Sequence, residues 1–158
     1  MWGYFSQFTL NDYSRTLWAT FLINGYSEHR IPLLHSIGAT YSAATNSVST
    51  VIILWSNPST SSQTLAELSQ NLTYIRIASI SVIRQPSTSL NLQFYLHKLI
   101  LTRAVLVYDE DVDPNIESIN FAFSVWKSNP DRLVGFFARA DGGHRAKEIA
   151  RDCSCDWV

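Results

Sequence analysis

Short, strongly apolar runs alternate along this chain with segments of helical periodicity, and the alternation constrains the fold more than any other feature. The runs are rich in β-branched residues and cover residues 19–23, 49–55, 77–83, 104–108 and 133–137. The 49–55 run, Ser-Thr-Val-Ile-Ile-Leu-Trp, is almost continuously apolar, as expected of a strand buried on both faces of a parallel sheet. We therefore predict an α/β fold, with a mostly parallel sheet flanked by helices.

Apolar residues at helical spacing predict helices between these strands. They fall on one face over residues 34–41, 64–72, 92–99 and 116–126. Pro32 suits the first turn of the first helix, and Asp113 is expected to cap the last one, with Pro114 at its first position. The aromatic side chains of the last helix, at Phe121, Phe123 and Trp126, are better explained by core packing than by sugar stacking.

Composition excludes several classes of protein. The 158 residues include 46% hydrophobic and 16% charged residues, which is typical of one folded domain and not of a disordered chain. The formal net charge of -1 gives no basic face, so we expect no nucleic-acid partner. No apolar run approaches the roughly 20 residues of a membrane span, and residues 1–10 do not resemble a signal peptide.

Three consecutive acidic residues, Asp109, Glu110 and Asp111, directly follow the predicted strand at 104–108. Neighbouring carboxylates repel one another unless something positive binds them, and oxygen ligands suit manganese or magnesium. Ligands of open α/β sheets bind at the carboxyl ends of strands, which is where this triplet falls. The alternative is a solvated acidic turn that precedes the helix cap at Asp113.

Other reactive residue types give weaker patterns. His29, His35, His97 and His144 lack the spacing of metal ligands, and the chain contains neither a Gly-x-Ser-x-Gly elbow nor a phosphate-binding loop. Two cysteines, Cys153 and Cys155, are interpreted as free thiols of the tail, although their oxidation stays open. Asn71-Leu72-Thr73 would be a glycosylation acceptor only in a chain that enters the secretory route.

Over roughly residues 17 to 144 the chain resembles the exostosin-like glycosyltransferase domain (glycosyltransferase family 64), in particular its plant-type members. The ordered match comprises residues 21–26, 51–58, 89–91 with Phe94, 104–111, 121–126, 130–131 and 134–136. The resemblance implies a GT-A-type, Rossmann-like nucleotide-diphospho-sugar transferase fold. It covers the donor-binding half of that domain, so we expect a fold truncated at its C-terminus, with residues 145–158 as a tail of uncertain structure.

The resemblance also implies an activity: transfer of an N-acetylhexosamine or related sugar from a UDP-sugar donor, with retention and with Mn²⁺ (or Mg²⁺) on the diphosphate. By position, Asp111 and Asp109 would ligate the metal. The donor would be bound by Asp109, Glu110, Asn57, Gly25, Asn91 and Gln93. A glycan or glycolipid acceptor would be bound by the half of the domain that this chain does not match, so no catalytic residue is assigned.

The chain departs from the family pattern at positions that would meet the donor. Gln93 stands where the family has Arg, which would remove a charge-assisted phosphate contact of roughly 1.5 to 3 kcal/mol. Where the family has another Arg soon after the first strand, this chain has Glu28, with only Arg30 as a displaced substitute. Whether this chain is an enzyme therefore stays open. The alternative is an inactive or truncated relative that binds metal or nucleotide, or acts only as an interaction domain. By resemblance, location would be the lumenal side of the Golgi or endoplasmic reticulum membrane, with an anchor only in a longer chain.

Overall fold

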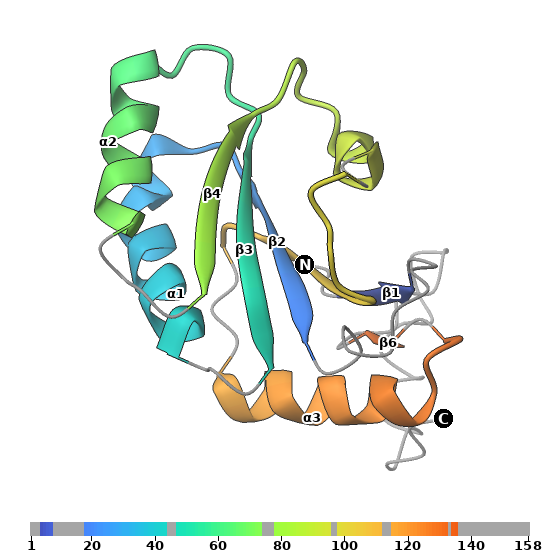
Figure 1. The fold of residues 1–158 in the computed structure, drawn as a ribbon. Coiled ribbons are helices and arrows are strands. Elements are labelled where there is room, and N and C mark those ends of the chain that lie inside the picture. The colour runs from blue at the N-terminus through green and yellow to red at the C-terminus, as the bar shows by residue number, and fades with distance from the viewer. Residues whose placement is uncertain are drawn as a thin grey trace, which may run out of the picture.

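The computed structural model describes residues 4–7, 18–43, 47–73, 78–95, 98–111, 115–132 and 134–135 (Figure 1). Within these ranges the chain forms one six-stranded sheet, three α-helices and two 3-10 helices. The predicted tail at 145–158, its cysteines, and the predicted cap at Asp113 lie outside the described residues. No helix of the described ranges is long and apolar enough to cross a membrane.

Four parallel strands form the centre of the sheet: β2 (Ala19–Gly25), β3 (Val48–Trp55), β4 (Ser79–Arg84) and β5 (Ala104–Asp109). The strand order is β4-β3-β2-β5-β1-β6, in which β1 (Tyr4–Gln7) runs antiparallel to both β5 and β6 (Val134–Gly135). The predicted α/β class and mostly parallel sheet are therefore confirmed. Since β2 lies between β3 and β5, its carboxyl end meets the ends of both neighbours.

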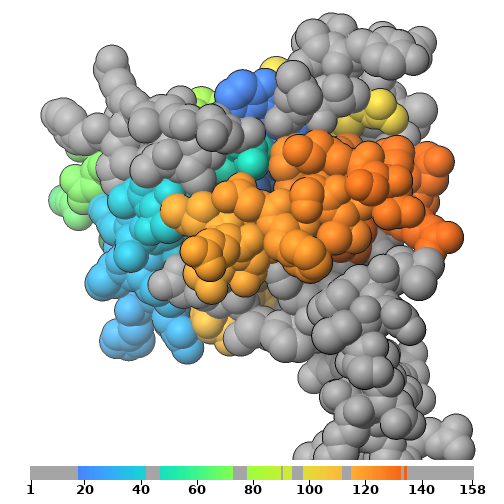
Figure 2. Space-filling view, turned by 90° about the horizontal axis from the view of Figure 1, so that it is seen from below, coloured from blue at the N-terminus to red at the C-terminus, as the bar shows by residue number. Residues whose placement is uncertain are grey.

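The helices are η2 (Glu28–Arg30), α1 (Ile31–Ala43), α2 (Ser62–Thr73), η3 (Leu90–Tyr95) and α3 (Ile116–Ser128). In Figure 1, α1 and α2 lie on one side of the sheet and η3 on the other. Figure 2 shows α3, in orange, beside α1, in blue to cyan. Ser47, just before β3, donates its hydroxyl hydrogen bond to Asn120 of α3 at 3.0 Å, so α3 contacts the amino end of that strand.

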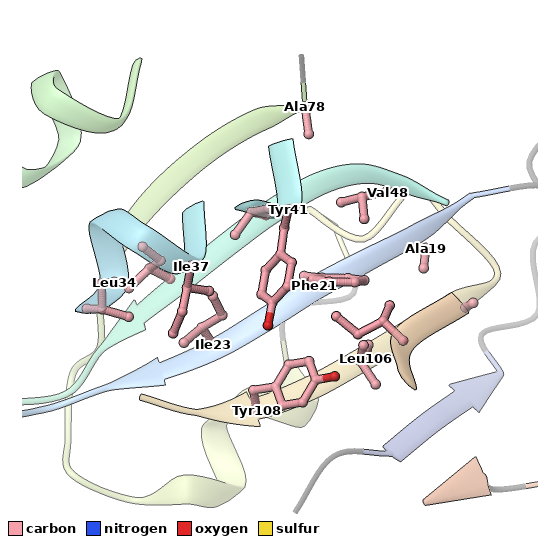
Figure 3. Close-up of a cluster of buried hydrophobic side chains, with 14 of the residues drawn as sticks. Ala19, Phe21, Ile23, Leu34, Ile37, Tyr41, Val48, Ala78, Leu106 and Tyr108 are labelled. Atoms are coloured by element: carbon pink, nitrogen blue, oxygen red, sulfur yellow. The ribbon is translucent and has the colours of Figure 1, made fainter. Parts of the chain in front are cut away.

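The larger hydrophobic core packs all three α-helices against one face of the sheet, as the inward-pointing side chains of α1, β2 and β5 show in Figure 3. The Phe21 and Tyr41 rings meet edge to face with centroids 4.9 Å apart, and Tyr41 stacks on Tyr108 at 6.4 Å. Burial raises the pKa of Tyr108 far above its ordinary value, with a smaller contribution from Tyr41. This aromatic cluster fixes β2 and β5 immediately before their polar ends.

The opposite face carries a smaller core of Leu22, Ile52, Leu54, Ile100, Val105 and Val107. In α3, Ile119, Ala122, Phe123 and Trp126 are buried, and the Phe123 and Trp126 rings stack at 5.8 Å. Their predicted role in core packing is confirmed. Phe121 was predicted to join them but is 55% exposed, because the helical turn places it away from that buried stripe.

Two further predictions of local structure are wrong. Residues 90–95 form a 3-10 helix and residues 98–99 a turn, where an α-helix was expected over 92–99. The three-residue step from Leu92 to Tyr95 fits a 3-10 helix equally well. The cap of α3 is Asn115, whose side-chain oxygen accepts the Ser118 N–H at 2.7 Å, and the helix begins at Ile116 rather than at Pro114.

Candidate functional site

Polar residues lie at or just after the ends of three adjacent strands, at the same edge of the sheet. In register, Asn24 of β2 lies opposite Asp109 of β5, and Gly25 lies opposite Trp55 of β3. Glu110 then continues from β5, and its backbone N–H donates to the Asn24 carbonyl at 3.0 Å. Ligands of open parallel sheets bind beyond this carboxyl edge, so the structure places the acidic triplet where a ligand site is expected.

Asn24 connects β2 with both β5 and η3. Its side-chain nitrogen donates to Asp109 Oδ1 at 3.2 Å and to Gln93 Oε1 at 2.8 Å. These contacts bring together two residues that the sequence had assigned to the donor site, Asp109 and Gln93. Asn91 was also predicted to bind the donor. It lies in η3 with Gln93, and it is exposed.

Glu110 contacts the turn that follows β2. Its Oε2 accepts the Tyr26 N–H at 2.6 Å, and its two oxygens accept the Ser27 N–H at 2.9 Å and 3.0 Å. The side chain is only partly exposed, while Asp111 next to it is exposed. The carboxylate of Glu110 is therefore engaged with the main chain, whereas Asp111 faces solvent.

The other side of the same turn is held from β3. Asn57 donates its side-chain N–H to the Tyr26 carbonyl at 2.9 Å and accepts the Ser59 N–H at 2.9 Å. Ser56 donates to the Gly25 carbonyl through its backbone N–H at 2.9 Å and its hydroxyl at 3.2 Å. Side chains of two neighbouring strands thus fix the backbone at 25–27.

Gly25 has a steric role at this edge. A Cβ atom added there would lie 2.8 Å from Cε3 of Trp55, whose side chain is fully buried. The absence of a side chain at position 25 therefore makes room for the Trp55 ring, which closes the core directly beneath the polar edge. Trp55 belongs to the core and not to the exposed surface of the site.

The carboxylate oxygens at this edge are of the chemical type that hard metal ions prefer. Magnesium is commonly held by only one or two protein carboxylates together with substrate phosphates, and Asp109 and Asp111 offer two. In the described ranges, no group of three or more His, Cys, Asp or Glu side chains could hold a metal.

Sequence reasoning missed several residues that organise the edge, namely Asn24, Tyr26, Ser27 and Ser56. Asn24 and Ser56 each stand at or just after the end of an apolar strand, and this position was the available signal. Nothing local indicated that Tyr26 and Ser27 would bind Glu110 through their backbone, since more than 80 residues separate them along the chain.

Comparison with known proteins decides the family. Residues 19–151 match the model of the glycosyl transferase family 64 domain, which covers every element from β2 to β6. The chain belongs to glycosyltransferase family 64. The exostosin-like resemblance is thereby confirmed.

The relatives that the chain matches carry different names. The chain is 56% identical over 125 residues to "Glycosyltransferase family protein 64 C3" of Arabidopsis thaliana, covering 78% of this chain and 38% of the relative. It is 46% identical over 55 residues to "Glucosamine inositolphosphorylceramide transferase 1" of the same plant, covering 35% of this chain and 7% of the relative. It is 38% identical over 69 residues to Exostosin-1 of Pongo abelii, covering 44% of this chain and 9% of the relative. This chain thus spans well under half the length of each of these relatives.

Proposed function

We propose that this family 64 chain binds a UDP-sugar through Mn²⁺ (or Mg²⁺) and serves as the donor-binding part of an enzyme that transfers an N-acetylhexosamine or related sugar with retention. The observation that carries the proposal is the joining of three strand ends by Asn24, Asn57 and Glu110, with Asp109 and Asp111 beside them. Such an edge is a place where a fixed backbone can meet a nucleotide diphosphate.

The residues have separate roles in this proposal. Asp111, which is exposed, and Asp109, which Asn24 orients, would hold the ion. Asn57, Gly25, Asn91 and Gln93 would line the donor site, and Glu110 would shape it. When bound, the metal supplies Lewis-acid neutralisation of the charge that develops on the diphosphate leaving group. Gln93 would contribute an uncharged contact where an Arg would contribute a charged one.

The remaining parts of the proposal rest on the resemblance to relatives. A glycan or glycolipid acceptor would be bound with the help of residues beyond those matched here, and the site of action would be the lumenal side of the Golgi or endoplasmic reticulum membrane. The relative whose name contains inositolphosphorylceramide, a glycolipid, favours a glycolipid acceptor.

Calorimetric titration of UDP into the purified chain, with and without Mn²⁺, tests the donor site. Heat that requires Mn²⁺ and that Asp111→Asn abolishes is the expected result. Glu67→Gln removes a comparable exposed charge on α2 and should leave the heat unchanged. A folded chain that gives no heat contradicts donor binding and leaves an interaction domain.

A further inference from the structure

We propose that Glu110 is a positioning residue: its carboxylate fixes the main chain of Tyr26 and Ser27 and remains there when the metal binds. The inference rests on the proposed function, because it concerns the shape of the proposed donor site. It separates Glu110 from its two neighbours, Asp109 and Asp111, which are the proposed ligands.

The contacts of Glu110 favour this role. A carboxylate has about four lone-pair sites, and three contacts to two backbone N–H groups already use both of its oxygens. Hydrogen bonds to an ionised acceptor are stronger than neutral ones, so withdrawal of Glu110 would leave the Tyr26 and Ser27 N–H groups without these acceptors. A metal would have to compete with that arrangement.

The main chain around the turn restricts the movement of Glu110 further. Its own N–H is bonded to the Asn24 carbonyl, so its backbone is joined to the strand that leads into the turn. From the opposite side, Asn57 holds the Tyr26 carbonyl and Ser56 holds the Gly25 carbonyl. Glu110 therefore supports the turn from one side, and Asn57 and Ser56 support it from the other. The Tyr26 side chain that the turn presents is 52% exposed at the edge of the site.

Amide hydrogen exchange at Tyr26 and Ser27, followed by NMR, tests the inference without any nucleotide. Both amides belong to residues that are at least partly exposed, so their protection depends on an acceptor. Glu110→Gln should accelerate exchange at both positions by about tenfold or more, since an amide side chain offers one oxygen in place of two. Glu67→Gln, the matched change on α2, should accelerate neither.

Addition of saturating Mg²⁺ to the unaltered chain distinguishes positioning from ligation; Mg²⁺ replaces Mn²⁺ here because it is diamagnetic and leaves the nearby amide signals visible. Unchanged or slower exchange at Tyr26 and Ser27 is the expected result. Faster exchange on adding Mg²⁺ would show that Glu110 leaves the turn for the metal, and unaltered exchange in Glu110→Gln would show that the turn does not need it. Either result overturns the proposal.

A second variant covers the case in which Glu110→Gln does not fold. Glu110→Asp keeps the charge but shortens the side chain, so it should also accelerate exchange at Tyr26 and Ser27, while the affinity for Mn²⁺ alone stays within about twofold. An unchanged exchange rate in Glu110→Asp contradicts the role. Failure of the chain to bind UDP refutes the proposed function only, because these exchange rates are measured without UDP.

Discussion

Asn24 and Asp109 lie opposite each other on parallel strands, and the Asn24 side-chain nitrogen divides its two N–H donors between Asp109 Oδ1 and Gln93 Oε1. An amide nitrogen has two donors, so both are used. A neutral side chain thus orients a carboxylate of the proposed metal site and connects it to η3. The orientation depends on Asn24 being an amide.

Replacement of Asn24 by Asp should therefore destabilise the chain and weaken Mn²⁺-dependent UDP binding. The new carboxylate would face Asp109 and the oxygen of Gln93, and we expect a loss of about 1–3 kcal/mol in the free energy of unfolding. Urea denaturation at pH 7 measures it. The combined change Asn24→Asp with Asp109→Asn returns an amide to the pair and should recover part of the loss. No recovery would contradict a direct interaction.

The contact between Gly25 and Trp55 predicts a steric cost at position 25. Gly25→Ala would place Cβ 2.8 Å from the buried Trp55 ring, and overpacking of this kind costs about 1–3 kcal/mol. At Gly38, in α1, the nearest atom is Cδ2 of Leu72, the end of a flexible side chain, and Ala gains about 1 kcal/mol of helix propensity. Denaturant melts should rank Gly25→Ala well below Gly38→Ala in stability. A Gly25→Ala variant more stable than Gly38→Ala would contradict the close contact between position 25 and the Trp55 ring.

The burial pattern of α3 predicts different costs for two neighbouring phenylalanines. Phe123 is 1% exposed and stacked on Trp126, so Phe123→Ala should cost about 3–5 kcal/mol. Phe121 is 55% exposed, so Phe121→Ala should change stability by less than about 0.5 kcal/mol. Thermal or urea unfolding of both variants checks the contrast. A large loss in Phe121→Ala would mean that its side chain is buried against something else.

The buried Thr20 and Thr102 hydroxyls form a directional chain. Thr102 donates its hydroxyl proton to the Ala104 carbonyl at 2.8 Å, so Thr20 must supply the proton in their 2.7 Å contact. Thr102→Val removes both hydrogen bonds and should cost about 2–3 kcal/mol, while Thr20→Val removes one and should cost about 1 kcal/mol. A double-mutant cycle in urea measures the coupling. Equal costs for the two variants would contradict this proton order.

The parallel strands could be predicted from the sequence because each one carries a dense apolar signal. β3, for example, has five consecutive buried residues from Val51 to Trp55, and β2 and β5 each have a run of the same length. The position of Asp109 at the end of a buried strand followed from the same signal. The strand order needed the structure, since sequence alone does not show that β5 pairs with β2.

The contacts that organise the site could not be predicted. Glu110 binds a turn more than 80 residues away along the chain. Such a contact depends on strand order and register, and the sequence near Glu110 does not indicate either of them. The sequence predicted Asp113 as the cap of α3, whereas the structure shows Asn115 in that role. Both residue types are good caps, and only the path of the backbone selects between them. In η3, a spacing of three residues fitted two kinds of helix.

The parallel pairing of β2 with β5 has a consequence for how the chain reaches its native state. Asn24 and Asp109 are 85 residues apart, and β1, near the start of the chain, pairs with the same late strand through Phe5 and Leu106. Closure of such long loops is slow, so β5 should dock after β2, β3 and β4 have assembled. The polar edge is then the last part to form, and a ligand that recognises it would bind only to molecules that have finished folding.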